Sequence, residues 1–236
     1  MLKYFILITL VITNFTSFSQ TINFKNKYFK NCVLEKYPEI DIDKNGEINQ
    51  LEADKVSKLS LMELNIENSE DIKHFKNLKY LSLTDNKISD FKISNFLYLE
   101  EIYIAKNNLS KIEISNFPSL KTLACGLNKI NEVRINNCPN VESLNLMYNQ
   151  INEIDIKSLK KLKYLSLDNN NLIDIDISNN TELIQIIIHN NHLKSLNIRN
   201  NLKLKMNILY IDKDVEILGN DEQLIMYKPA KILKQN

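Results

Sequence analysis

The sequence predicts an α/β fold: a solenoid of short coils whose strands form one parallel sheet, preceded by a small α-helical cap. Three observations lead to this prediction. Residues 75–200 divide into six consecutive segments of equal length, a 21-residue repeat with no insertion or deletion. The apolar positions of these segments stay in register. An acidic loop at 41–52 lies shortly before the array.

The first half of each segment has the spacing of a strand. In the first segment the apolar residues are Leu78, Leu81 and Leu83, so the last two point the same way and their neighbours point the other way. A single coil cannot bury its leucines, whereas stacked coils with parallel strands can. One polar residue recurs in every segment, at Asn86, Asn107, Asn128, Asn149, Asn170 and Asn191. We expect its amide to satisfy backbone groups of its own and the adjacent coil.

The second half of each segment carries short β-branched stretches, such as Ile112 and Ile114. This spacing indicates a second extended segment on the convex side, because so short a repeat leaves little room for a long helix.

Each segment reads L-x-x-L-x-L-x-x-N-x-L, and this pattern resembles leucine-rich repeat proteins over more than half of the chain. We assign residues 56–200 to the array, as one irregular opening coil (56–77) and six regular ones. Residues 201–236 begin like a further coil and then depart from the pattern, which indicates a C-terminal cap. Seven coils at about 4.8 Å give a sheet roughly 34 Å long.

Residues 41–52 read DIDKNGEINQLE and fit the EF-hand loop D-x-[DN]-x-[DN]-G-x5-E. Gly46 falls where such a loop turns sharply, and Ile48 is the apolar residue expected to face inward. The predicted calcium ligands are Asp41, Asp43, Asn45, Glu47 through its carbonyl, Asn49 through water, and Glu52.

Amphipathic stretches at 24–36 and 51–58 predict helices on both sides of the loop, the first ended early by Pro38. Residues 20–55 would thus form a helical EF-hand cap. Because no second loop is visible, we interpret the calcium as a structural brace of the N-terminal end, with a regulatory ion as the alternative.

A D-x-D-x-N-G-x-I-x-x-x-E loop leading into 21-residue repeats with an I-x-I-S-N second half resembles secreted surface proteins of Bacteroidetes-type bacteria. The resemblance covers residues 24–200. It implies an exported binding or adhesion role and names no ligand.

Residues 1–19 have the features of a secretory signal: Lys3, an apolar run, and a small-residue cleavage pattern before Gln20. We therefore expect a secreted or surface-exposed monomer that does not insert into the membrane after cleavage. A net charge of +1 disfavours nucleic acid as a partner. Of the three cysteines, Cys125 and Cys138 occupy apolar positions of the repeat, and Cys32 has no obvious partner.

Outward positions of the predicted strands form rows along the concave surface, and most of their side chains are small and polar. Aromatic and apolar exceptions are typical of interfaces with other proteins. The predicted ligand-binding residues are Tyr80, Tyr103, Met147, Tyr148, Tyr164 and Ile187.

Catalysis has little support, because the chain has no glycine-rich phosphate loop and no nucleophile elbow. His189 and His192 flank one Asn pair without a third ligand. The sequence thus predicts a non-enzymatic module, braced by calcium, that binds a protein, peptide or glycan. The first alternative is a self-associating structural or adhesive protein, and the second is an enzyme or enzyme inhibitor that uses the concave face.

Overall fold

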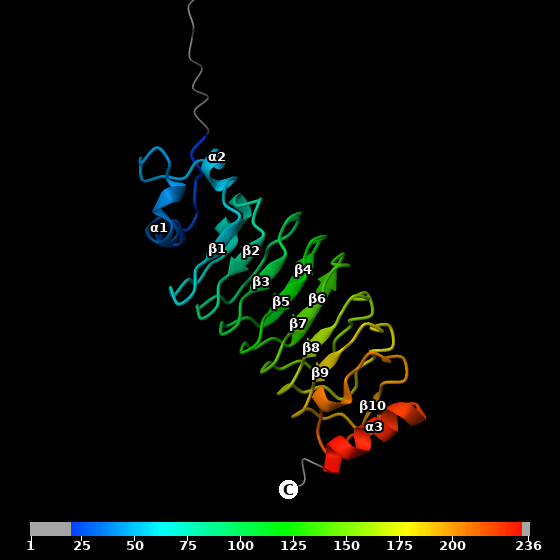
Figure 1. The fold of residues 1–236 in the computed structure, drawn as a ribbon. Coiled ribbons are helices and arrows are strands. Elements are labelled where there is room, and N and C mark those ends of the chain that lie inside the picture. Colours follow the sequence, from blue (N-terminus) through cyan, green and yellow to red (C-terminus); the bar gives the residue numbers. More distant parts are fainter. Residues whose placement is uncertain (1–19, 233–236) are drawn as a thin grey trace, which may run out of the picture.

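The computed structural model describes residues 20–232, so the predicted signal at 1–19 lies outside the described residues. These residues form a solenoid with a helix near each end, α1 (Lys27–Lys36) and α3 (Asp221–Ile232) (Figure 1). No helix within the described range is long and apolar enough to cross a membrane.

One side of the solenoid is a parallel sheet of eight strands, which confirms the predicted parallel architecture. Equivalent positions of consecutive repeats pair with each other, as Leu81 with Ile102 and Leu144 with Leu165. The strands, in sheet order, are β1 (Lys58–Ser60), β2 (Tyr80–Ser82), β3 (Glu101–Tyr103), β5 (Thr122–Ala124), β7 (Ser143–Asn145), β8 (Tyr164–Ser166), β9 (Gln185–Ile187) and β11 (Leu209–Tyr210).

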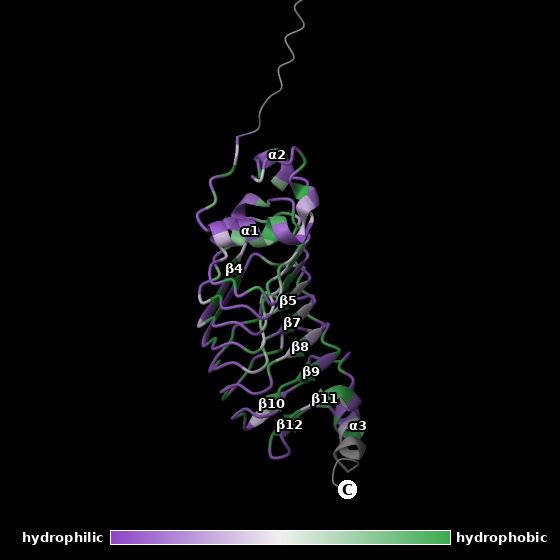
Figure 2. Ribbon diagram, turned by 90° about the vertical axis from the view of Figure 1, so that its left-hand side faces the viewer, coloured by the Kyte–Doolittle hydropathy of each residue, from purple (hydrophilic) through white to green (hydrophobic). Residues whose placement is uncertain are grey.

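The opposite side carries short strands in only part of the array (Figure 2). They pair as β4 (Lys111–Ser115) with β6 (Glu132–Asn136), and β10 (Ser195–Asn197) with β12 (Glu216–Leu218). These are the extended segments that the second half of the repeat predicts. Within residues 75–200, which contain no α-helix, the second half of the repeat therefore forms a strand only at β4, β6 and β10.

The core lies between the two sides. The leucines of the first repeat, Leu78, Leu81 and Leu83, are completely buried. The residue that opens each repeat forms a second buried column, in which the rings of Phe96 and Phe117 stack at 5.9 Å between centroids. Toward the C-terminal end this column changes from aromatic to polar. Its members are Phe75, Phe96, Phe117, Cys138, Leu159, Asn180 and Asn201.

The recurring asparagines form the predicted ladder. In each, Oδ1 accepts a hydrogen bond at 2.9–3.0 Å from an N–H of the preceding coil, and Nδ2 donates to carbonyls of both coils. For Asn107 these partners are the N–H of Ile88 and the carbonyls of Leu83 and Ile104. Each amide thus joins two coils where the chain turns away from the main sheet.

The N-terminal cap contains α1, a short 3-10 turn at Pro38–Ile40, and α2 (Gln50–Ala53). The helix expected over 51–58 is therefore wrong in its extent. A capping box between Asn49 and Glu52 starts α2. The chain then becomes extended because Leu59, which is completely buried, belongs to β1 at the edge of the main sheet.

The main sheet also continues past the last regular repeat. Residues 201–218 contribute a 3-10 turn (Met206–Ile208), β11 and β12, and so extend both sides of the solenoid. The sheet thus holds one strand more than the seven coils predicted. In the first turn of α3, the Gln223 side chain donates to the carbonyl of Ile198 and covers the last coil.

Candidate functional site

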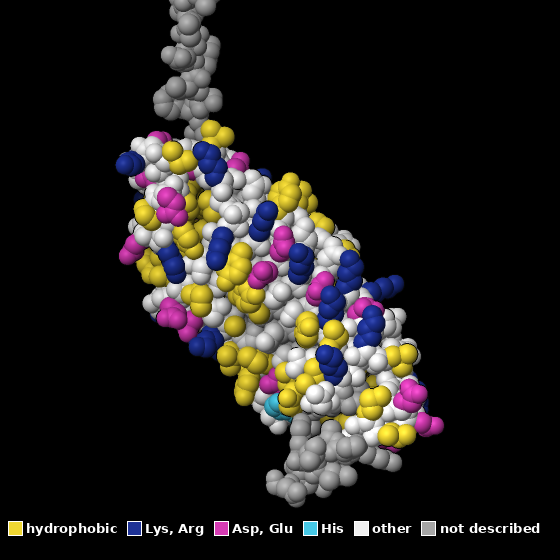
Figure 3. Space-filling model, in the orientation of Figure 1, with side chains coloured by type: hydrophobic (Ala, Val, Ile, Leu, Met, Phe, Trp, Pro, Cys, Tyr) yellow, Lys and Arg dark blue, Asp and Glu magenta, His cyan; other side chains and the backbone are white. Residues whose placement is uncertain are grey.

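The outward positions of the main sheet form a continuous surface, here called the main-sheet face. Strand pairing places its residues in rows one coil apart, as predicted: Tyr80 lies beside Glu101, and Ser82 beside Tyr103. These side chains are mostly half-buried, whereas the leucines and isoleucines that alternate with them are buried. Figure 3 shows hydrophobic side chains gathered along the middle of this face, with charged side chains between them.

Two of the predicted ligand-binding tyrosines contact each other near the N-terminal end of the face. The rings of Tyr80 and Tyr103 lie 5.4 Å apart, and the ammonium of Lys58 lies 4.9 Å from the Tyr80 centroid. The Tyr103 hydroxyl donates to the Glu101 carboxylate at 2.7 Å. This hydrogen bond, together with burial, raises the pKa of Tyr103 to about 12. The pair is therefore an aromatic surface in which the Tyr103 hydroxyl already has a partner.

Three other predicted residues, Met147, Tyr164 and Ile187, line a hollow of about 380 Å³ over β7, β8 and β9. The buried leucines Leu144 and Leu165 also line it. Tyr164 is 45 % exposed, so part of this residue is accessible to a ligand. The structure thus divides the predicted binding residues into an aromatic pair and a separate hollow.

Tyr148, the sixth predicted residue, joins neither group. It lies in the turn after β7, with a left-handed backbone (φ 52°), and its side chain is exposed. The residues one repeat before and after it, Leu127 and Asn169, have the same backbone conformation. The repeat therefore fixes the position of Tyr148 at the rim of the main sheet.

Beside the start of the strands, a row of alternating charges runs from coil to coil. Lys121 pairs with Glu100 at 2.6 Å, and Lys163 pairs with Glu142 at 2.8 Å. These ion pairs lower the pKa of both glutamates and raise that of both lysines. Exposed pairs of this kind contribute little stability, but they neutralise the border of the main-sheet face.

The acidic loop brings three of its predicted ligands together. Carboxylate oxygens of Asp41, Asp43 and Glu52 all lie within 4.8 Å of one another, the one such cluster of His, Cys, Asp or Glu side chains found among residues 20–232. The Asp41 carboxylate accepts the N–H groups of Asn45 and Gly46. Glu52, which is 3 % exposed, accepts those of Ile42 and Asn49.

The other predicted calcium ligands have different contacts. Asn45 donates its amide to Asp43 at 3.0 Å, so it remains beside the cluster. The Glu47 carboxylate pairs with Lys30 on α1, and the Asn49 side chain caps α2 by accepting the Glu52 N–H. Oxygen donors with three negative charges suit a hard divalent cation such as Ca²⁺. The donor set of the loop therefore fits calcium.

Backbone contacts hold the acidic loop against the start of the described chain. The N–H of Ile22 donates to the carbonyl of Ile48 at 2.9 Å, and Thr21 forms an antiparallel bridge with Asn49. The start of the described chain thus pairs with the loop, and Ile48 is completely buried.

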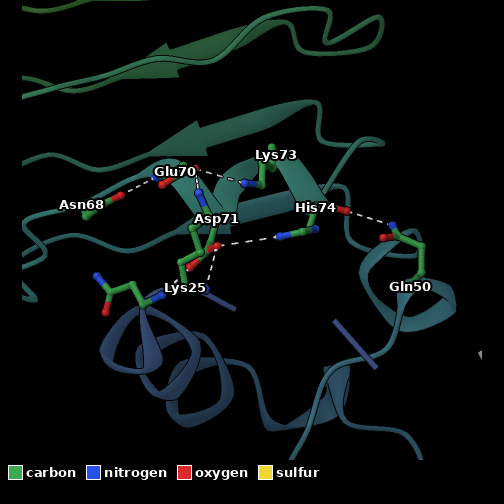
Figure 4. Close-up of polar contacts among 8 residues, drawn as sticks. Lys25, Gln50, Asn68, Glu70, Asp71, Lys73 and His74 are labelled. Carbon is green, nitrogen blue, oxygen red and sulfur yellow. Dashed lines mark hydrogen bonds and ion pairs between the residues drawn. The ribbon is translucent and has the colours of Figure 1, made fainter. Parts of the chain in front are cut away.

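A buried carboxylate ties this cap to the first coil (Figure 4). Asp71, in the 3-10 helix Glu70–His74, is 1 % exposed and accepts the N–H groups of Lys25 and Asn26 at 3.1 and 2.7 Å. The imidazole of His74 lies 3.7 Å from the same carboxylate, and its backbone carbonyl accepts the Gln50 amide. Burial lowers the pKa of His74, with the Asp71 charge opposing the change. The junction is therefore a polar contact in which burial disfavours the protonated form of His74.

Sequence reasoning did not identify Asp168 as a candidate, although its row is otherwise Thr84, Ala105, Gly126, Met147 and His189. The structure places it in the wall of the hollow, 6 % exposed. The sequence feature that could have identified Asp168 is a single carboxylate in a row of otherwise uncharged or weakly basic residues. His189 itself does not belong to any group of three metal-ligating side chains in the described part of the chain.

Comparison with known proteins supports the repeat assignment. Residues 77–99 match the family described as Leucine Rich Repeat. No curated protein matches the sequence.

Among solved structures, internalin C2 from Listeria monocytogenes is similar in fold. It has a TM-score of 0.65 and 21 % sequence identity, and the match covers 88 % of this chain and 96 % of that one. Internalin F from the same organism is 20 % identical, with a TM-score of 0.46, over 90 % of this chain and 76 % of that one. With the stacked coils described above, the likeness to internalin C2 shows that this chain has an internalin-like solenoid fold, and one of its coils matches the leucine-rich repeat family.

Proposed function

We propose that this chain is an exported, non-enzymatic binding module whose main-sheet face holds a protein, peptide or glycan strand. The observation that carries the proposal is the hollow of about 380 Å³ in that face, bordered by Met147, Tyr164 and Ile187. The regular apolar residues of these strands, Leu144, Leu165 and Ile186, are buried, whereas these three side chains lie at outward positions. Accessible aromatic and methionine side chains on a rigid sheet are typical of interfaces.

The dimensions of the sheet favour a narrow partner. Eight strands at about 4.8 Å span roughly 34 Å, and strands of three residues are about 10 Å wide. The resulting area of roughly 340 Å² is less than half of the roughly 800 Å² per partner in a standard interface. An extended segment lying along the face fits this shape better than a globular surface does.

Export is part of the proposal and depends on residues 1–19. The apolar run after Lys3 and the small residues before Gln20 have the pattern of a cleaved signal. Expression with the native N-terminus in a Gram-negative host should yield a mature chain that begins at Gln20. Recovery of an uncut chain in the cytoplasm would contradict this part.

The acidic loop is proposed to hold a structural Ca²⁺ ion. Side-chain oxygens of Asp41, Asp43, Asn45 and Glu52 would bind it, with the Glu47 carbonyl and a water held by Asn49 completing the set. Among the described residues, the three clustered carboxylates have no lysine or arginine in an ion pair with them, which supports this proposal. The ion would neutralise the loop and thereby stabilise the N-terminal cap against the first coil.

Partner capture with matched variants tests the main-sheet face. Immobilised protein, residues 20–236, is exposed to a cell-surface extract, and bound proteins are crosslinked and quantified. A Tyr103→Ala, Tyr164→Ala double variant should recover the partner poorly, whereas Tyr98→Ala should recover it normally. Tyr98 is a suitable control because its side chain is 52 % exposed and does not belong to the main-sheet face.

Equal recovery by both variants would overturn the role of the face. Sedimentation of the wild-type protein separates the self-associating alternative. A concentration-dependent dimer that the double variant abolishes would favour self-association over binding of another molecule.

A further inference from the structure

The hollow in the main-sheet face contains a carboxylate that has no cationic partner among the described residues. Asp168 lines the hollow and is 6 % exposed. One carboxylate oxygen accepts the Ser166 hydroxyl at 2.8 Å, and the other accepts the Asn169 amide at 2.9 Å. No lysine, arginine or histidine nitrogen of residues 20–232 forms an ion pair with it. The carboxylate is therefore held in one orientation before any ligand arrives.

Two lysines beside the main sheet already have acidic partners. Lys163, just before β8, pairs with Glu142, and Lys121, just before β5, pairs with Glu100. The charges around the border thus cancel one another, whereas the charge of Asp168 is not cancelled. Because a buried carboxylate is poorly solvated, an opposite charge entering the hollow gains more there than on the open surface.

The apolar walls determine which cation fits. Tyr164 presents an exposed ring, on which a planar cation can stack. Met147 and Ile187 can contact the methylene groups of a long basic side chain. A guanidinium can also donate to both carboxylate oxygens, each of which has a free lone pair. A compact ammonium uses only part of this arrangement.

We propose that the hollow binds an arginine side chain of an extended partner segment, with Asp168 as the residue that selects for positive charge. This inference rests on the proposed function of the main-sheet face and specifies its partner. The apolar walls of the hollow would contact the methylene groups of the arginine and the neighbouring side chains of the partner. The expected motif is therefore a basic residue flanked by apolar ones.

A random heptapeptide library displayed on phage tests this without knowledge of the natural partner. Selection on the wild-type protein should enrich peptides that contain arginine next to apolar residues. Their affinity, measured by fluorescence anisotropy, should fall roughly tenfold or more with Asp168→Asn, and equally when citrulline replaces the arginine. Asn keeps an oxygen for the Ser166 hydroxyl, and an unchanged melting temperature would show that this variant is folded.

The matched control is Asp174→Asn, because Asp174 is an exposed carboxylate in the second half of the same coil. It should leave peptide affinity unchanged. Selected peptides without a basic residue, or arginine peptides that bind Asp168→Asn as well as wild type, would overturn the inference. A selection that yields no Asp168-dependent peptide would overturn it too.

These outcomes differ from a failure of the proposed function. If peptides lack arginine but lose affinity in the Tyr103→Ala, Tyr164→Ala variant, the face binds ligands by other means. If neither variant affects any selected peptide, the proposed function of the face fails as well.

Discussion

Removal of one ladder amide, in Asn107→Ala, should cost far more stability than removal of its neighbour in Asn108→Ala. Asn107 is 7 % exposed and accepts the Ile88 N–H at 3.0 Å. It also donates to the carbonyls of Leu83 and Ile104 at 2.9 and 3.2 Å. The exposed Asn108 side chain has none of these contacts, so it is a control one residue away.

The loss of stability in Asn107→Ala depends on which of the backbone partners of Asn107 keep another hydrogen bond. The Ile88 N–H would be left buried without an acceptor, at about 1–3 kcal/mol. The Leu83 carbonyl keeps the Asn86 amide and the Ile104 carbonyl keeps the Asn128 amide, so each loses about 1 kcal/mol. The free energy of unfolding should therefore fall by about 3–5 kcal/mol in Asn107→Ala and by less than about 0.5 kcal/mol in Asn108→Ala.

Urea unfolding followed by circular dichroism measures both variants against wild type, with the midpoint shift as the readout. Midpoints that agree between the two variants would refute the view that the asparagine amides join successive coils. A large loss in both would point instead to a general sensitivity of this turn.

Three further predictions concern the cap and the core. If the acidic loop binds Ca²⁺ with a dissociation constant of about 10⁻⁴–10⁻³ M, addition of 10 mM Ca²⁺ should raise the melting temperature by about 3–10 °C. Glu52→Gln should abolish this rise, whereas the control Glu39→Gln should keep it. An unchanged melting temperature of the wild type would contradict the role of calcium as a brace. The lowered pKa of His74 means that the unfolded chain binds the proton more readily, so stability should be full above about pH 6.5 and decrease below it. In His74→Gln the free energy of unfolding should change less between pH 7.5 and 5.5 than in the wild type. The same pH dependence in both proteins would contradict this role of His74. Burial raises the pKa of the Cys125 thiol, so a thiol reagent should modify it only after unfolding, and rapid labelling of the folded protein would refute its burial.

Much of the fold could be predicted because each coil contacts only its neighbours at a fixed offset. Leu81 and Asn107 occupy recurring positions, and a recurring position has a recurring environment. Sequence periodicity therefore predicted the strands, the buried face and the amide ladder together. The same reasoning failed where periodicity ended, at the short α2 and at the strand formed by Leu209 and Tyr210.

The polar end of the core column was also missed. Asn180 and Asn201 take positions that Phe96 and Phe117 occupy earlier. Their amides donate to buried carbonyls, so the column continues as hydrogen bonds in place of stacked rings. A local pattern search finds the aromatic residues and overlooks this exchange, because its reason lies in carbonyls of other coils.

The candidate site was less predictable than the fold. The rows of the main-sheet face follow from register, but the hollow depends on the sizes of side chains from three strands. Periodicity also placed Tyr148 with the other candidates, although its turn carries it to the rim of the sheet. The sequence placed Asp168 at an outward position of its strand row. Only its burial and its hydrogen-bond partners distinguish it from an ordinary surface carboxylate.

Hydroxyl-radical footprinting of the protein with a captured partner directly tests whether the main-sheet face binds it, because the method reports the oxidation of individual tyrosine and methionine side chains. The partner should protect Met147 and Tyr164 from oxidation. Tyr28 and Tyr98, each 52 % exposed and away from the main-sheet face, should be oxidised equally with and without the partner. Protection of Tyr28 or Tyr98 with no change at Met147 and Tyr164 would contradict binding at the main-sheet face.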